Sequence, residues 1–289
     1  MTFALRAFSY FLGALPEWCA RALAAVLGGL LWHVIRYRRA VILENLTTAF
    51  PEWTERRRYQ LGKEYSRHLA LSLIEFFRIP RYARRNYEGV FEVRGFEHYR
   101  AAQAKGRGVL VVTGHLGSFE LGAGAMARLL DGEPVWLVVK SFPRALDAFV
   151  TWVRRSTNLR IIAAKDSMPV ITGALDRNET VVFVVDQNAT HRLGVFVDFF
   201  GKQACTMSAL AVLAARRRAP VVGAGIWREP DGRHLMQIYE EIPMERMGKA
   251  RETIRHMTQV YTRFIEDRIR EHPAQWLWSH RRWKTRPSA

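Results

Sequence analysis

The stretch that most constrains the fold is residues 108–124, which predict a strand, a turn and the start of a helix. Val109–Val112 is an apolar run, rich in β-branched side chains and too short for a helix, so we expect a buried strand. From Ser118 onward the apolar residues recur at helical spacing, and Ser118 is a suitable N-cap. A strand–turn–helix unit of this kind is typical of an α/β sheet, where functional sites lie beyond the carboxyl ends of the strands.

Two side chains in this stretch can carry chemistry. His115 lies in the expected turn, and Glu120 follows in the first turn of the helix. A neutral imidazole can take a proton from a hydroxyl group near pH 7, while a carboxylate holds its other ring nitrogen. The two side chains can meet only if the chain bends between them, which Gly114 and Gly117 make easier. The alternative is a surface histidine near a glutamate that the helix dipole favours.

The sequence His-Leu-Gly-Ser-Phe-Glu-Leu at residues 115–121 resembles the His-x-x-x-x-Asp/Glu box of the glycerolipid acyltransferase superfamily. More narrowly, it is similar to the lipid A biosynthesis late acyltransferases, the lauroyl/myristoyl acyltransferase family. That family usually has Asn where this chain has Ser118 and Trp where it has Phe119. The resemblance implies that His115 and Glu120 are catalytic, with Glu120 orienting His115, and that Gly117 and Ser118 take part in substrate binding.

The same resemblance extends to three substrate-binding candidates in the middle of the chain. Arg154 aligns with a family arginine and could grip a phosphate with two hydrogen bonds. Its helix, expected over residues 146–155, should however end at the edge of the sheet opposite the site. Asp186 and Gln187 end an expected strand and match the family's Asp-Gln segment.

Two aromatic segments complete the resemblance, which covers about residues 10–285. Residues 194–201 match a Gly-Val-Phe-Val-Pro-Phe-Phe-Gly segment, with Asp198 in place of proline. Phe199 and Phe200 could wall an acyl-chain slot, and core packing is the alternative. Residues 272–284 closely match a His-Pro-Glu-Gln-Trp-Leu-Trp-x-His-Arg-Arg-Trp-Lys segment. Interleaved tryptophan and arginine also suit a membrane interface.

Composition limits the class of protein. With 289 residues and 49% hydrophobic content, the chain can form one large α/β domain. We expect Cys19 and Cys205 to be unpaired, as in a reducing compartment. The net charge of +17 fits anionic lipids, phosphorylated glycolipids or an acidic carrier protein. Nucleic acid is a weaker candidate, because the charge is spread along the chain and no nucleic-acid-binding motif is visible.

Residues 3–35 are unusually apolar and are followed at once by a basic run from Arg36 to Arg39. We predict that residues 1–39 form a helical membrane anchor and that residues 40–289 form the α/β acyltransferase domain. The anchor is either a single span or a helical hairpin half-buried in one leaflet, with a soluble core helix as the third possibility. The positive-inside rule favours the cytoplasmic face, and the family resemblance implies the bacterial inner membrane.

The rest of the chain predicts a fold in which helices precede a βα alternation. We expect helices over residues 40–50 and 55–77, the second capped by Thr54. Strands alternating with helices predict a largely parallel central sheet flanked by helices on both faces. The expected strands are 90–93, 109–112, 134–139, 159–163, 180–186, 220–226 and 235–239, and the expected helices between them are 96–105, 146–155, 168–176, 207–217 and 247–271.

The resemblance implies a membrane-associated O-acyltransferase that needs no cofactor and no metal. An acyl group would pass from a thioester, on acyl carrier protein or coenzyme A, to a hydroxyl group of a lipid A precursor. Positive charge or backbone N–H groups near the turn at residues 114–118 would hold the oxyanion. Alternatives are the same reaction on a phosphatidylinositol mannoside or a lysophospholipid, a non-catalytic membrane protein, and a nucleic-acid-binding protein.

Overall fold

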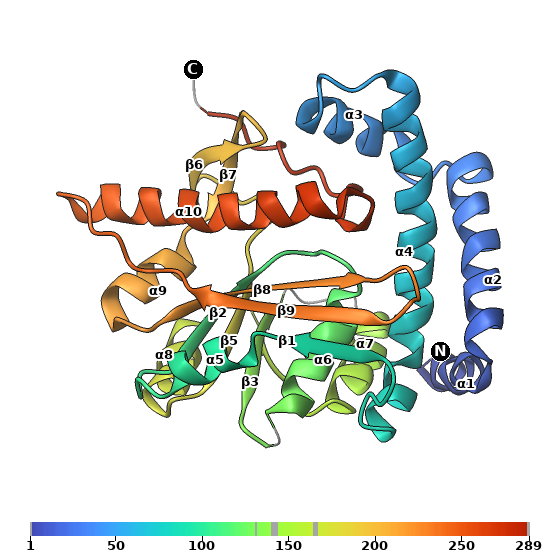
Figure 1. Ribbon diagram of the computed structural model, residues 1–289, viewed down its shortest axis with the longest axis horizontal. Coiled ribbons are helices and arrows are strands. Elements are labelled where there is room, and N and C mark those ends of the chain that lie inside the picture. Colours follow the sequence, from blue (N-terminus) through green and yellow to red (C-terminus); the bar gives the residue numbers. More distant parts are fainter. Residues whose placement is uncertain (1, 131, 140–143, 164–166, 288–289) are drawn as a thin grey trace.

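The computed structural model describes residues 2–130, 132–139, 144–163 and 167–287. In these residues a seven-stranded sheet forms the centre of the molecule, with strand order β1-β9-β8-β2-β5-β3-β4 (Figure 1). Neighbouring strands of this sheet are parallel except β8 and β9. The predicted α/β class, with a largely parallel sheet flanked by helices, is confirmed. The strands are β1 (Phe91–Arg94), β2 (Val109–Thr113), β3 (Val135–Val139), β4 (Arg160–Ala163), β5 (Thr180–Val184), β8 (Val221–Arg228) and β9 (His234–Glu241).

The helices fall close to their predicted positions, and a small hairpin was missed. The missed hairpin is antiparallel and consists of β6 (Gly194–Phe199) and β7 (Lys202–Met207). Its sequence was predicted only to match a family segment. The helices are α1 (Thr2–Ala14), α2 (Glu17–Gly29), α3 (Arg39–Ala49), α4 (Glu55–Arg84), α5 (Phe96–Gln103), α6 (Phe119–Leu129), α7 (Arg144–Arg155), α8 (Met168–Asp176), α9 (Ala209–Arg217) and α10 (Ala250–Glu271).

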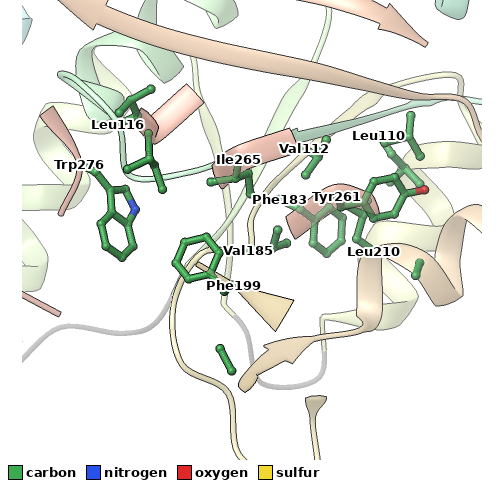
Figure 2. Packing of buried hydrophobic residues seen from close by; sticks show 14 of the residues in the cluster. Leu110, Val112, Leu116, Phe183, Val185, Phe199, Leu210, Tyr261, Ile265 and Trp276 are labelled. Carbon is green, nitrogen blue, oxygen red and sulfur yellow. The ribbon is translucent and has the colours of Figure 1, made fainter. Parts of the chain in front are cut away.

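Strand β2 lies in the interior of the sheet, between β5 and β8, which explains its continuous apolar run. Val109 and Val111 pack under α5, α6 and α7, whereas Leu110 and Val112 belong to a core shared with α8, α9 and α10. Figure 2 shows this second core, in which Val112 and Phe183 lie near side chains of α10. Because both faces of β2 are packed, the position of its last residue is fixed, and so is the position of the turn that follows it.

Helix α4 forms one side of the molecule and carries the amino-terminal helices (Figure 1). Its N-cap is Thr54, as predicted: the Oγ1 atom accepts a hydrogen bond of 3.2 Å from the Arg57 N–H. The helix continues through Pro80 to Arg84, beyond the predicted end at Phe77. Helices α1 and α2 pack along α4, and α2 does so through small alanine side chains.

The outer surface of α1 and α2 is apolar. Among the described residues, no single helix is both long and apolar enough to cross a membrane. Taken together, α1 and the continuous segment of α2 and a π-helical turn (Leu30–Val34) have the required length and composition, but they are bent by 120°. The large apolar side chains that this region exposes include Phe3, Phe11, Trp18, Val26, Val34 and Ile35. The predicted division at residue 39 stays a prediction.

Candidate active site

His115 lies in the turn between β2 and α6, as the sequence predicted. The turn requires glycine at position 117, which has φ +60° and no room for a Cβ atom beside the Ile226 carbonyl. Residues 275–277 hold the turn from the other side. The Gly117 N–H donates to the Gln275 carbonyl over 2.9 Å, and the Leu277 N–H donates to the His115 carbonyl over 3.2 Å. These hydrogen bonds fix the backbone at His115 and at Gly117. The side chain of His115 is 16% exposed.

The carboxylate that contacts His115 is Asp186, not Glu120 as predicted. Asp186 Oδ1 lies 2.7 Å from His115 Nδ1, and Asp186 Oδ2 accepts the His115 backbone N–H over 2.7 Å. Strand order explains the error. Thr113 of β2 is paired with Val184 of β5, so the same register continued by two residues places Asp186 beside His115. A helix that begins at Phe119 directs Glu120 elsewhere.

The environment of Asp186 keeps it ionised. The carboxylate is buried and also accepts the indole N–H of Trp276 over 2.7 Å. Burial on its own would raise the pKa of Asp186, but the charge and hydrogen bonds of His115, with the indole of Trp276, lower it to about 2. An ionised carboxylate only accepts, so the proton of a neutral His115 lies on Nδ1 and the lone pair on Nε2. Gln187, predicted at the site, lies there: its Nε2 is 3.1 Å from His115 Nε2.

Glu120 forms a two-bond ion pair with Arg154. The Arg154 guanidinium donates to the two Glu120 oxygens over 3.1 Å and 2.5 Å, and both side chains are largely buried. The sequence predicted that α7 would carry Arg154 to the far edge of the sheet. Instead, Thr157, which follows α7, packs on Gly124 of α6, one helical turn after Glu120. The chain therefore runs alongside α6 towards the far edge only after α7 has ended. Arg154 therefore stays at the same edge as His115.

An apolar cavity of about 470 Å³ opens beside His115 and passes between the sheet and α6. Glu120, Arg154 and Gln187 line it with His115. Its deep end reaches Tyr99, whose hydroxyl group lies 2.7 Å from the Thr180 hydroxyl at the start of β5. The cavity thus follows the length of β5, about 13 Å at the usual rise per residue. Its apolar walls include Val111, Met126, Leu137, Val182, Val222, Met236 and Ile238.

Phe199 and Phe200 do not line this cavity. Both are buried on the opposite face of the sheet, where Phe199 packs against Trp276 with ring centroids 5.6 Å apart. The core-packing alternative is the correct one for these two residues. Trp276 and Trp278 are also fully buried, so they do not lie at a membrane interface. Sequence reasoning did not identify Trp276 as a hydrogen-bond donor to Asp186, because the two residues are 90 positions apart.

Three backbone N–H groups of the turn at residues 114–118, where the sequence predicted positive charge or N–H groups to hold an oxyanion, already have acceptors. The N–H groups of His115, Leu116 and Gly117 donate to Asp186, Gly114 and Gln275 respectively. Ser118 is buried at the N-cap position of α6, and its side chain makes no capping bond. The first-turn N–H groups of α6 have no acceptor within the helix. Among the described residues, no group of three or more His, Cys, Asp or Glu side chains is arranged to hold a metal ion.

Both cysteines, Cys19 and Cys205, are free, as predicted.

Residues 1–285 match the family described as "Bacterial lipid A biosynthesis acyltransferase". The lipid A biosynthesis lauroyltransferase of Escherichia coli (strain K12) is 31% identical over 265 residues, covering 90% of this chain and 84% of that protein. The lipid A biosynthesis palmitoleoyltransferase of the same organism is 27% identical over 265 residues, covering 90% and 83%. A lipid A biosynthesis acyltransferase of Haemophilus influenzae is 22% identical over 273 residues, covering 94% and 83%. These similarities extend through the cavity, the His115 turn and the amino-terminal helices.

Proposed function

Since this chain belongs to the family of bacterial lipid A biosynthesis acyltransferases, we propose that it transfers a fatty acyl chain from a thioester donor to a hydroxyl group of a lipid A precursor. The enzyme class and the lipid A-type acceptor follow from the family. The observation that supports the chemistry is a His115–Asp186 pair at the mouth of an apolar cavity. Such a pair supplies a base at the place where the end of an acyl chain would emerge.

In the proposed mechanism His115 is the general base. The acceptor hydroxyl group displaces the Gln187 amide from His115 Nε2 and gives that atom its proton. Asp186 stabilises the imidazolium that forms and holds the ring by its Nδ1–H. The acceptor oxygen attacks the thioester carbonyl carbon. The C–S bond then breaks, and the imidazolium returns the proton to the leaving thiolate. No acyl-enzyme is formed in this sequence.

The cavity and the α6 terminus have separate roles in the proposal. The acyl chain occupies the space between the sheet and α6, because most of the wall of this cavity is apolar and the burial of apolar surface is favourable. The carbonyl oxygen then lies near the first turn of α6, where unpaired N–H groups and the helix dipole stabilise negative charge. Arg154 and Glu120 close one side of this end of the cavity.

We propose acyl carrier protein as the donor, with coenzyme A as the alternative, because the net charge of +17 favours an acidic partner. We also propose that the protein sits on the cytoplasmic face of the bacterial inner membrane. The apolar outer surface of α1 and α2 supports a half-buried hairpin. The test is vesicle flotation of a variant carrying Phe11→Ser and Trp18→Ser. Flotation should fall, whereas Leu193→Ser with Met247→Ser, exposed elsewhere, should leave it unchanged.

The test of function is transfer in vitro, followed by mass spectrometry of the lipid product. The purified chain is mixed with acyl carrier protein or coenzyme A thioesters of different lengths and with a lipid A precursor. We expect the acceptor mass to rise by one acyl group, more rapidly with the carrier-protein donor. Acylation of lysophospholipid or phosphatidylinositol mannoside alone would contradict the acceptor, and no transfer to any lipid would contradict the proposal.

A further inference from the structure

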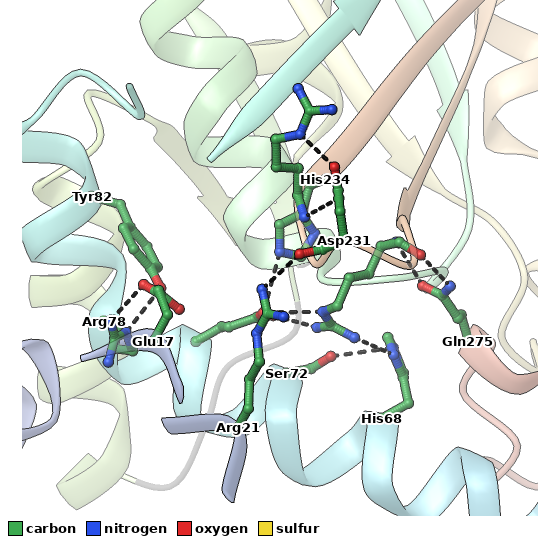
Figure 3. A network of polar contacts seen from close by, with 12 residues as sticks. Glu17, Arg21, His68, Ser72, Arg78, Tyr82, Asp231, His234 and Gln275 are labelled. Carbon is green, nitrogen blue, oxygen red and sulfur yellow. Dashed lines mark hydrogen bonds and ion pairs between the residues drawn. The ribbon is translucent and has the colours of Figure 1, made fainter. Parts of the chain in front are cut away.

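A second cavity, of about 270 Å³, lies at the elbow between α1 and α2. It shares no lining residue with the apolar cavity beside His115. Its walls come from the elbow itself, from the second half of α4, and from the turn between β8 and β9. Figure 3 shows side chains from these three regions converging, including Arg21, Arg78 and Asp231. We call this space the elbow cavity. Its lining is mostly polar, which is unusual beside a helix pair with an apolar outer surface.

Arginine dominates the elbow cavity. Five arginines line it, against three glutamates, and two of those carboxylates are already committed to partners. Glu17 pairs with Arg78 over 2.6 Å, and Glu75 pairs with Arg228. The five arginines are Arg21, Arg78, Arg81, Arg85 and Arg233.

Several of these guanidinium groups have more N–H donors than their hydrogen bonds use. Arg21 donates to the backbone carbonyl of Asp231 over 3.0 Å, and Arg81 donates to the carbonyl of Gly13. Neither contact neutralises the charge. Arg85 is exposed, and its side chain has no polar partner among the described residues. Arg78 is paired with Glu17 and Arg233 with Asp231, so the surplus of charge and of N–H donors comes from Arg21, Arg81 and Arg85.

His234 provides an independent sign that a ligand is missing from this cavity. It lines the cavity, is 2% exposed, and its Nε2 lies 3.2 Å from Glu75 Oε1. Its other ring nitrogen, Nδ1, is buried and has no hydrogen-bond partner among the described residues. Buried polar atoms are normally satisfied, and one that is not requires an explanation. A ligand bound in the cavity would supply a partner for this nitrogen.

The elbow cavity and His115 lie at the same edge of the sheet. Strand β8 runs parallel to β2, so its end at Arg228 points the same way as the turn that holds His115. The Gln275 amide bridges them: it bonds to both backbone groups of Arg228, and the Gln275 carbonyl accepts the Gly117 N–H. A lipid bound at His115 could therefore place a second polar group in the elbow cavity.

We propose that the elbow cavity binds a phosphomonoester group carried by a lipid. A phosphomonoester has close to two negative charges and three acceptor oxygens, which match a cavity with surplus arginine donors and an unpartnered histidine nitrogen. Two lipids could supply it: the acceptor, if it is phosphorylated, or a phospholipid of the surrounding membrane. Only the first source rests on the proposed acyltransferase function.

The first experiment tests the chemistry without catalysis. Thermal unfolding of the full chain is measured with and without inorganic phosphate, and binding is measured by flotation with phosphatidic acid vesicles. The test variant carries Arg21→Gln and Arg85→Gln, two exposed arginines that make no ion pair among the described residues. Its control carries Arg251→Gln and Arg255→Gln, exposed arginines of α10 that make the same change in net charge. We expect phosphate to raise the melting temperature of wild type and control but not of the test variant.

The vesicle measurement gives the matching expectation. Flotation with phosphatidic acid should fall roughly tenfold more in the test variant than in the control. With phosphatidylglycerol, a phosphodiester, the two variants should behave alike, because only overall charge then matters. Equal responses of the two variants to phosphate and to phosphatidic acid would overturn the proposal.

The second experiment separates the two sources. Transfer kinetics are compared for a phosphorylated glycolipid acceptor and for the same acceptor after phosphatase treatment. If the acceptor supplies the group, the test variant shows a raised KM for the phosphorylated acceptor only, with kcat kept. If a membrane phospholipid supplies it, KM is unchanged and only flotation falls. Absence of transfer by wild type would contradict the proposed function but leave the first experiment valid.

Discussion

The two cavities described above have opposite chemistry, and the mouth of the first lies at the same edge of the sheet as the second. The cavity beside His115 is enclosed mainly by strands and α6, and most of its wall is apolar. The elbow cavity is enclosed by parts of α2 and α4 and by the loops next to them, and arginine is its commonest residue. Strands buried on both faces supply valine and leucine, whereas helices at the surface can turn long cationic side chains inward. In the two proposals, the first cavity holds the acyl chain of the donor and the second holds a charged group of another lipid.

A cluster of paired polar side chains, Arg228, Glu75, His68 and Ser72, lies beside the elbow cavity. Arg228 makes a two-bond ion pair with Glu75 of α4, with distances of 3.2 Å and 2.5 Å. Its remaining guanidinium nitrogen donates to His68 Nδ1 over 2.7 Å, so the other ring nitrogen of His68 donates to Ser72 (Figure 3). Each of these four side chains thus has a hydrogen-bond partner.

The largest effect should come from His115, the proposed general base. His115→Ala is expected to lower kcat by at least about 10³-fold, because a positioned base contributes about 10²–10⁴-fold. Binding to phosphatidic acid vesicles should not change, since His115 is not part of the elbow cavity. Transfer kinetics and flotation of the same preparation check both parts. Near-normal transfer by the variant would contradict the mechanism.

Asp186 should matter more than Glu120. Asp186→Asn is expected to lower kcat by about 10²–10³-fold, because an amide cannot stabilise the imidazolium. Glu120→Gln keeps a partner for Arg154 and should cost at least ten times less. With His115→Ala already present, Asp186→Asn should add little, as expected for residues that act as a unit. If Glu120→Gln is the more damaging single change, the carboxylate that supports His115 is not Asp186.

Lengthening a side chain of α6 should change the donor preference. Ala123 lines the apolar cavity, so Ala123→Leu is expected to lower transfer of the longest accepted chain roughly tenfold and to favour shorter ones. Ala101→Leu, at an exposed position of α5, is the matched control. Competition between donors of different lengths, read by mass spectrometry, gives the result. An unchanged product distribution would show that the acyl chain lies elsewhere.

Arg154→Lys should lower kcat/KM by a smaller amount, roughly threefold to tenfold, because lysine cannot keep both bonds to Glu120. Arg155→Lys, at an exposed neighbouring position, should have no effect. Assays below substrate saturation distinguish the two variants. Equal activity of both would mean that the Glu120–Arg154 pair does not shape the mouth of the cavity.

The smallest effect concerns His68, a member of this polar cluster, and the stability of the protein at acid pH. Loss of solvation, followed by the neighbouring Arg228 guanidinium, lowers the pKa of His68 from 6.5 to about 3. The unfolded chain therefore takes up the proton first. The contribution of His68 to stability is complete above pH 6.5 and is lost as the pH falls towards 3, by at most about 1.4 kcal/mol per pH unit.

His68→Gln keeps a polar side chain but does not titrate. Its free energy of unfolding, measured between pH 7 and pH 4 by denaturant titration, should fall less steeply than that of wild type. Asp186 does not interfere in this range, because its lowered pKa affects stability only below about pH 4. Parallel curves would show that His68 takes up its proton equally in the folded and unfolded states.

The sequence predicted what depends on local pattern. The apolar run Val109–Val112 predicted β2, Thr54 predicted the start of α4, and the glycines around His115 predicted its turn. What could not be predicted depends on strand order. β5 follows β3 and β4 along the chain yet pairs directly with β2, and only that pairing brings Asp186 to His115. Glu120 is nearer to His115 in the sequence, which is why the local pattern predicts Glu120 as the carboxylate that orients His115.

The aromatic residues illustrate a second limit. Phe199, Trp276 and Trp278 have side chains that suit an acyl slot, a membrane interface or a protein core equally well. Only the packing decides, and here all three are buried in the core opposite the cavity. The elbow cavity was likewise not predicted, because its arginines come from segments far apart in the chain.

The bracing of the His115 turn by residues 275–277 has a consequence for biosynthesis. Proteins emerge from the ribosome amino-terminus first, at about 5–20 residues per second. The apolar helices, β2 and the cavity wall are thus all made before Gln275 and Trp276 exist. Until these residues arrive, Gly117 and Asp186 lack partners that fix the base. A nascent chain would therefore form its apolar helices while the site is still incomplete, and the contacts that hold His115 and Asp186 would be completed only after residues 275–277 have been made.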